Sequence, residues 1–169
     1  MTWASAYPWL LVFHVLCVFA FLAIHGVSMG VWWRVRRERD RAKLSALLGL
    51  SVSFVTPMSV ALLLLIVSGI LVGVAAAWWF NGQWWLWASV ALLVIIIAVM
   101  TPLVAIPMSA MRRGLGMPSR TDVKAGNVPS PVDDAALDRL LLDRRPAIGS
   151  SIAIAGIVVI TWLMESKPF

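Results

Sequence analysis

Two histidines are the side chains of this sequence best suited to bind a metal-containing cofactor. His14 and His25 are the two histidines of the chain, and eleven residues separate them. On an α-helix this spacing is about three turns, so the imidazoles would point to nearly the same side, roughly 16 Å apart along the axis. An imidazole nitrogen can ligate haem iron, and two histidines so far apart cannot share one iron. The pattern therefore predicts His14 and His25 as separate candidate haem or metal ligands.

Each iron would need a second ligand, and methionine is the type that the chain offers. Met58, Met100 and Met108 lie in other apolar segments, and Met58 falls at the same end of its segment as His25. In a symmetric dimer His14 could instead pair with its own copy. The structural alternative is that each imidazole bonds a Ser, a Thr or a backbone carbonyl of a neighbouring helix, because an unpaired polar group in hydrocarbon is unfavourable. The sequence leaves both interpretations open.

Other chemistries find little support in the residue pattern. The interiors of the apolar runs contain no Asp, Glu, Lys or Arg. Pumps, ion-coupled carriers and voltage sensors depend on such intramembrane charges, so the pattern argues against an autonomous transporter. Zinc or copper catalysis would need more ligands than two histidines supply. The inventory favours a non-catalytic role.

The elements that would hold these histidines are long apolar helices. Of the 169 residues, 61% are hydrophobic and 13% are charged, far from the composition of a soluble domain. A membrane-spanning helix needs about 20 apolar residues, and the run 44–79 is long enough to require a bend, for which Pro57 is the natural place. The sequence predicts an all-α fold, a four-helix transmembrane bundle forming one domain over 1–169. The predicted spans are about 9–33, 55–78, 84–108 and 147–164.

The basic residues predict how the bundle is oriented. Segment 34–43 carries six Lys or Arg, segment 80–83 none, segment 112–146 seven and the C-terminal tail one. The positive-inside rule then makes 34–43 and 112–146 cytoplasmic loops and puts both termini outside. We expect a multi-pass protein of the bacterial inner (cytoplasmic) membrane. Its net charge of +6 would meet anionic lipid of the bilayer rather than nucleic acid, because the arginine cluster is short and lacks interleaved aromatics.

The third loop is predicted to contain a short amphipathic helix. Ser130 is the expected N-cap and Pro131 the first-turn residue, and the body 135–143 places leucines on one face at helical spacing. The leucines are Leu137, Leu140 and Leu141. Such a helix would lie at the inner headgroup layer or dock on a partner protein.

Two pairs of glycines predict close helix packing. Gly26 and Gly30 form one G-x-x-x-G step on the first helix, and Gly69 and Gly73 form another on the second. Small residues at this spacing let two helix backbones approach closely within a membrane. The faces could build the bundle itself or join subunits of a homo-oligomer.

Several short motifs resemble known bacterial membrane families. They are the opening Trp9-Leu10-Leu11-Val12-Phe13-His14-Val15, the Ser68-Gly69 step, the entry Trp84-Trp85-Leu86-Trp87 and the ending Trp162-Leu163-Met164-Glu165-Ser166-Lys167-Pro168. Over essentially its whole length the chain resembles a bacterial family of predicted four-helix integral membrane proteins of unknown function. It is more distantly similar to the membrane domain of copper-resistance protein D and to the HemJ-type protoporphyrinogen oxidase. The latter resemblance implies a role for His14 in haem binding, because a first-helix histidine is implicated there.

These observations lead to one functional expectation and one alternative. The expected function is a non-catalytic membrane accessory subunit of a bacterial electron-transfer assembly, with other membrane subunits or a second copy as partners. Haem b is its candidate cofactor, with His14, His25 and Met58 as candidate ligands. The alternative is a membrane enzyme or carrier in porphyrin or copper metabolism.

Overall fold

The protein is a bundle of long helices. The computed structural model describes residues 3–168, and within that range every regular element is helical. Four of its helical stretches are long and apolar enough to cross a membrane: Ser5–Val35, Arg41–Ala75, Trp84–Gly114 and Asp134–Ser166. The elements are α1 (Trp3–Val35), α2 (Arg41–Ser53), α3 (Val55–Ala75), η1 (Trp78–Phe80), α4 (Trp84–Met100), η2 (Thr101–Ala105), α5 (Ile106–Gly114), α6 (Arg120–Lys124), α7 (Asp134–Leu141) and α8 (Arg145–Ser166).

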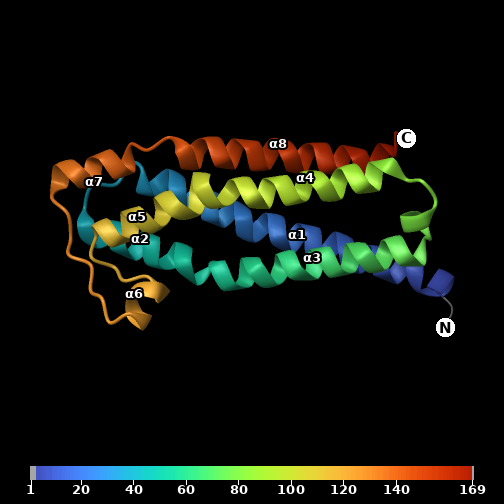
Figure 1. Ribbon diagram of the computed structural model, residues 1–169, viewed down its shortest axis with the longest axis horizontal. Helices are drawn as coiled ribbons and strands as arrows, with labels where there is room; N and C mark the ends of the chain where they lie inside the picture. Colours follow the sequence, from blue (N-terminus) through green and yellow to red (C-terminus); the bar gives the residue numbers. More distant parts are fainter. Residues whose placement is uncertain (1–2, 169) are drawn as a thin grey trace.

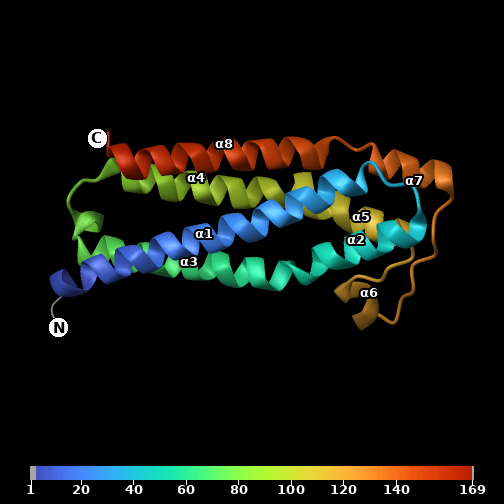
Figure 2. The same ribbon diagram turned by 180° about the vertical axis from the view of Figure 1, so that it is seen from behind.

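The long helices are arranged as two antiparallel pairs. Helix α1 packs along α3, and α4 packs along α8 (Figure 1). The short helices α2, α5, α6 and α7 gather at one end of the molecule, which we call the loop end. Both termini and η1 lie at the opposite end, the terminal end, as the reverse view in Figure 2 also shows. Both basic connections predicted from the sequence therefore fall at the loop end.

The second apolar run is divided near its predicted bend. Helix α2 ends at Ser53 and α3 begins at Val55, so the break falls at Phe54, three residues before Pro57. Pro57 thus sits in the first turn of α3, where its missing N–H is not needed for a helical hydrogen bond. The start at 55 is the predicted one, and the end at Ala75 comes three residues before the predicted 78.

A tight turn explains why α3 ends early. Ala77 adopts the left-handed region with φ of 55°, which no helix can continue through. The chain then turns back, and the indole Nε1 of Trp79 donates a hydrogen bond to the Ile70 carbonyl over 3.1 Å. Gly73 lies directly beneath that indole, so this glycine makes room for Trp79 of its own hairpin.

The third span bends at its prolines and is longer than predicted. A π-helical segment, Thr101–Ala105, joins α4 to α5 and contains Pro102. Such a segment accommodates a proline by widening the turn, so that a carbonyl accepts from the amide five residues on, as the Thr101 carbonyl does from Ile106. The helix continues to Gly114, six residues past the predicted end at 108.

The helix of the third loop differs from its prediction at its cap and in what it covers. Asp133, not Ser130, is the N-cap of α7, and its Oδ1 accepts the Ala136 amide over 2.7 Å. Leu137 and Leu141 are 3% and 1% exposed, buried by the chain itself rather than turned to lipid or to a partner. The reason is that α5 packs against α7 and the end of α1 supplies a large apolar surface beside it.

That surface belongs to the main hydrophobic core of the molecule, which we call the loop-end core. Its buried residues come from α1, α2, α5 and α7: Val31, Trp32, Val35, Leu44, Leu48, Met111, Leu137 and Leu141. Two ion pairs at its edge hold α7 in place, Arg39 to Asp138 at 3.1 Å and Arg41 to Asp134 at 2.7 Å. The loop end is therefore a packed unit that ties the two helix pairs together.

Candidate functional site

His14 is buried between α1 and α3. His14 is 8% exposed, and Nδ1 of its imidazole lies 2.9 Å from the hydroxyl oxygen of Ser68. Ser68 is completely buried, and its hydroxyl donates to the Leu65 carbonyl over 3.1 Å. Of the two interpretations left open by the sequence, the contact with a Ser of a neighbouring helix is the one seen for His14.

The contact between His14 and Ser68 is compatible with either neutral tautomer of the imidazole. In the tautomer that also keeps the bond from the Ser68 hydroxyl to the Leu65 carbonyl, Nδ1–H donates to Ser68 and Nε2 has the free lone pair. Metal-binding histidines commonly have this arrangement, with one ring N–H donated to a second group that fixes the ring. In that tautomer Ser68 fixes the ring, and Nε2 is the nitrogen able to accept a hydrogen bond or ligate a metal.

Gly69 provides the space that the imidazole of His14 occupies. A Cβ placed on Gly69 would lie 3.1 Å from Cε1 of His14, closer than almost all real contacts. The small residue predicted to permit close packing thus packs against a histidine of α1. Gly69 belongs to the His14 site as well as to the α1–α3 interface.

His25 has a different environment. Both of its ring nitrogens are withdrawn from solvent, and neither has a hydrogen-bond partner within the described part of the chain. Its ring stacks on Phe21, one turn earlier on α1, with centroids 5.8 Å apart and planes inclined by 20°. A neutral imidazole has one N–H donor and one nitrogen acceptor, and within the described chain neither group of His25 has a hydrogen-bond partner.

The antiparallel register keeps Met58 among the candidate ligands of His25. His14 lies opposite Ser68, so eleven residues along α1 correspond to eleven residues back along α3. This carries His25 to the level of Pro57 and Met58, which is about 16 Å from the His14 site. The structure thus gives the two histidines separate surroundings, and Met58 remains a predicted partner of His25.

The other sequence predictions separate into packed and open positions. Gly69 and Gly73 are filled, by His14 and by Trp79, whereas a Cβ at Gly26 or Gly30 would meet nothing within 4 Å. The first G-x-x-x-G step therefore does not build this bundle, because it faces away from α3. Among residues 3–168 no group of three or more His, Cys, Asp or Glu side chains comes together as a metal site.

Sequence reasoning missed Ser68 as a site residue and the polar character of Trp32. Trp32 is 4% exposed, and its indole Nε1 is buried without a partner in the described chain, as are the nitrogens of His25. A serine in an apolar run is a usable signal for Ser68, since a buried hydroxyl generally has a partner. No sequence signal distinguishes Trp32 from Trp33, because their exposure depends on which side of α1 meets the loop-end core.

The comparisons with known proteins add no relative. No family model matches the chain, and neither a curated protein nor a solved structure matches it. The functional argument therefore stands on the residues and their geometry.

Proposed function

We propose that this protein is a non-catalytic, multi-pass accessory subunit of the bacterial inner membrane that would hold a b-type haem in an electron-transfer assembly, with His25 as a ligand of the iron. The observation that carries the proposal is the unpartnered imidazole of His25 on a membrane-spanning helix. Leaving a buried polar group unpaired costs about 1–3 kcal/mol in proteins. A partner outside the chain removes that cost.

The surroundings of His25 fit a residue that would hold a haem. Phe21 holds the plane of the imidazole by stacking, and the neighbouring apolar surface of α1 keeps water away from it. Met58, at the corresponding level of α3, is the second candidate ligand. A haem supplies a one-electron couple between its ferric and ferrous states, and the task of this chain is to bind and orient it.

His14 is assigned mainly a structural role in this proposal. It joins α1 to α3 through Ser68, and this contact exists in the chain alone. His14 has a second ring nitrogen besides the one at Ser68, so His14 remains the alternative candidate ligand, at a separate site about 16 Å from His25. The orientation proposed from the charges places the loop end in the cytoplasm, His25 toward the inner leaflet and His14 toward the outer one.

The decisive experiment is visible spectroscopy of the protein purified in detergent, before and after dithionite. The proposal expects a Soret band that shifts on reduction, is lost in His25→Ala and is kept in His14→Ala. Ser28→Ala, a small polar substitution one turn from His25 on α1, is the matched control and should retain the band. A band lost in His14→Ala alone would transfer the ligand role to His14. A colourless preparation that turns over a porphyrinogen would overturn the proposal in favour of a porphyrin enzyme.

A further inference from the structure

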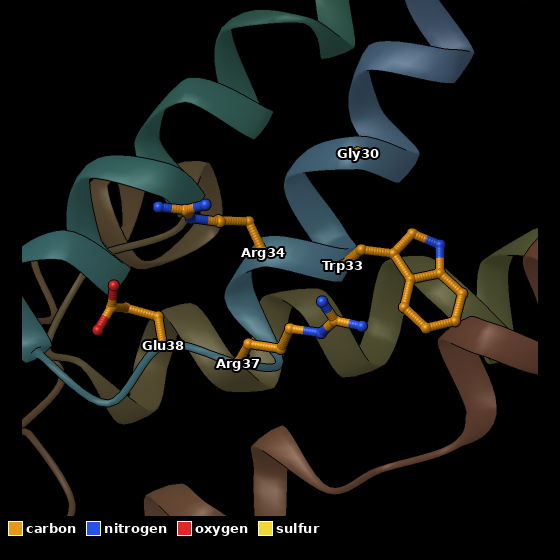
Figure 3. A pocket seen from close by; sticks show the side chains of 5 residues that line it. All are labelled: Gly30, Trp33, Arg34, Arg37 and Glu38. Atoms are coloured by element: carbon orange, nitrogen blue, oxygen red, sulfur yellow. The ribbon is translucent and has the colours of Figure 1, made fainter.

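A hollow lies on the exposed side of α1, at the C-terminal end of that helix. Its cavity volume is about 360 Å³, and its lining residues are Gly30, Trp33, Arg34, Arg37 and Glu38. Figure 3 shows Arg34 and Glu38 extending to one side and Trp33 and Arg37 to the other, with Gly30 one turn closer to the N-terminus of α1. Arg37 and Glu38 follow the end of α1 at Val35. Because Gly30 has no side chain, the space above the two arginines stays open.

The two arginines of this hollow are available for an anion. Four other arginines near the loop end form ion pairs with aspartates: Arg39, Arg41, Arg113 and Arg145. Within the described chain, Arg34 and Arg37 make no ion pair. Arg34 lies in the last turn of α1 and Arg37 in the turn that follows it, and they extend to opposite sides of the hollow that both line. The hollow therefore has one guanidinium group on each side of it.

Glu38 leaves the net charge of the hollow positive. Its carboxylate accepts the backbone amides of Arg39 and Asp40, over 2.9 and 3.1 Å, and is directed to the connection between α1 and α2. Two guanidinium groups against one carboxylate give the hollow a net charge of +1. The complementary ligand is an anion about the size of a phosphate group. The hollow also has room for a polar group beside that anion.

An apolar stripe continues from the hollow along α1. Gly26 and Gly30 are exposed on the same side of the helix, one turn apart, and a Cβ at either would touch nothing. Trp33 is 50% exposed at the junction of the stripe and the arginines, where indole side chains favour the headgroup layer. This face of α1 can therefore accommodate a hydrocarbon chain, and the face ends at the positively charged hollow.

We propose that this surface binds one anionic glycerophospholipid. The phosphate lies between Arg34 and Arg37, where guanidinium groups bind phosphate oxygens through charge-assisted hydrogen bonds. Trp33 stands at the glycerol level, and one acyl chain lies along Gly30 and Gly26. This assignment is independent of the haem proposal, because the stripe is on the side of α1 opposite Trp32 and the loop-end core.

The experiment is native mass spectrometry of the full-length protein in detergent, titrated with phosphatidylglycerol. Two variants with the same change in charge are compared: Arg34→Gln with Arg37→Gln, and Arg139→Gln with Arg144→Gln. Basic residues at a membrane surface contribute roughly fivefold each to binding of acidic lipid, so we expect about a thirtyfold loss for the first pair. The control pair, which lies outside the hollow, should lose less than about threefold. Equal losses in the two variants would show diffuse electrostatics and overturn the site.

A second variant tests the shape of the site at constant charge. A Cβ at Gly30 would meet no protein atom within 4 Å, and leucine favours the helix, so we expect Gly30→Leu to fold normally with its side chain in the hollow. We expect it to lose bound phosphatidylglycerol as the arginine pair does. Unchanged binding of phosphatidylglycerol by Gly30→Leu would contradict the proposal. It would also be contradicted if the original protein is a dimer and Gly30→Leu dissociates the dimer without changing the amount of bound lipid.

Two ligand controls separate a lipid site from a simple anion site. Phosphatidylcholine, with the same acyl chains and no net charge, should bind at least about tenfold more weakly, because the hollow carries net positive charge. Millimolar inorganic phosphate should not displace the phospholipid, since the acyl track adds hydrophobic burial. Full displacement by phosphate would overturn the lipid assignment.

Discussion

The contact between His14 and Ser68 shows how one buried polar pair can determine the register of two helices. The two residues are 54 positions apart in the sequence and meet at 2.9 Å within the α1–α3 pair. Sliding α1 by one residue would remove both the hydrogen bond and the space at Gly69. In an apolar interface, where most side chains tolerate small shifts, this pair selects one alignment.

Replacing Ser68 with alanine tests that role. We expect Ser68→Ala to lower the free energy of unfolding by about 0.6–2 kcal/mol, the range of interhelical hydrogen bonds measured in membranes. The measurement is unfolding of the purified protein in mixed micelles. Ser59→Ala is the matched control, because the Ser59 hydroxyl bonds only the Val55 carbonyl of its own helix in the described chain and is exposed. Equal effects of the two substitutions would show that the His14 bond does not stabilise the pair.

The sequence could predict the type of partner that His14 needs but not its identity. An imidazole in an apolar run requires a donor or acceptor, and Ser68 is one of several hydroxyls on other helices. Selecting Ser68 requires the alignment of α1 and α3, which depends on where α1 ends and on the break at Phe54. For the same reason the open side of Gly26 and Gly30 could not be distinguished from the filled side of Gly69 and Gly73.

At the scale of elements, short polar signals determine where the loop helices begin. Ser119 and Asp122 form a reciprocal cap at the start of α6: the Ser119 hydroxyl and amide both donate to the Asp122 carboxylate, over 2.6 and 2.9 Å. The Asp122 amide in turn donates to the Ser119 hydroxyl over 3.1 Å. This five-residue helix is absent from the sequence-based prediction, because a single turn has no hydrophobic periodicity to detect.

The cap of α6 should make its order depend on pH. The pKa of Asp122 lies below its ordinary value, first because the Ser119 hydroxyl bonds the carboxylate, then because of the Ser119 amide and the charge of Arg113. A carboxyl whose native pKa is lowered stabilises the fold above its unfolded pKa, and this contribution is lost as the pH falls through the native value. Amide chemical shifts of residues 119–124 should therefore stay constant from about pH 7 to about pH 5 and change below about pH 4. Asp122→Asn should remove that dependence.

The ends of helices were predictable from the sequence where a proline or a charged residue marks them. They were not predictable where tertiary packing determines the position at which the helix ends. The break near Pro57 and the number of long helices follow from the lengths of the apolar runs, whereas the pairing of α1 with α3 and of α4 with α8 does not. The end of α3 at Ala75 depends on Trp79 turning back onto Ile70, a contact that no local rule describes. Asp133, rather than Ser130, is the N-cap of α7, because the helix begins at Asp134 and the Asp133 carboxylate accepts the Ala136 amide.

At the scale of the whole molecule, buried area is concentrated at the loop end. Leu44 is fully buried there, whereas Leu63, at the middle of α3, is 60% exposed. We expect Leu44→Ala to cost about 2–5 kcal/mol of unfolding free energy, the range for a buried leucine, and Leu63→Ala to cost much less. Thermal unfolding in one detergent measures both. A larger effect at Leu63 would mean that the exposed side of α3 is packed against another molecule.

The orientation of the whole molecule is testable with single cysteines. Starting from Cys17→Ser, cysteines are placed at Asn81, in the terminal-end hairpin, and at Lys124, in the third loop, both of which are exposed. The charge distribution predicts that a membrane-impermeant maleimide labels Asn81→Cys in spheroplasts and Lys124→Cys only after lysis. Labelling in the reverse pattern would invert the depths assigned to His14 and His25.

The two-pair arrangement has a consequence for how the protein is built. Each pair is a hairpin of neighbours that pack on each other, and the contacts between hairpins are concentrated near the two ends of the bundle, in the loop-end core and around Trp78, Trp85 and Lys167. Each half can therefore insert as an independent unit before the halves associate. We expect fragments 1–81 and 82–169, made from separate messages in one cell, to co-purify through a tag on either one, which would make this a naturally divisible polypeptide.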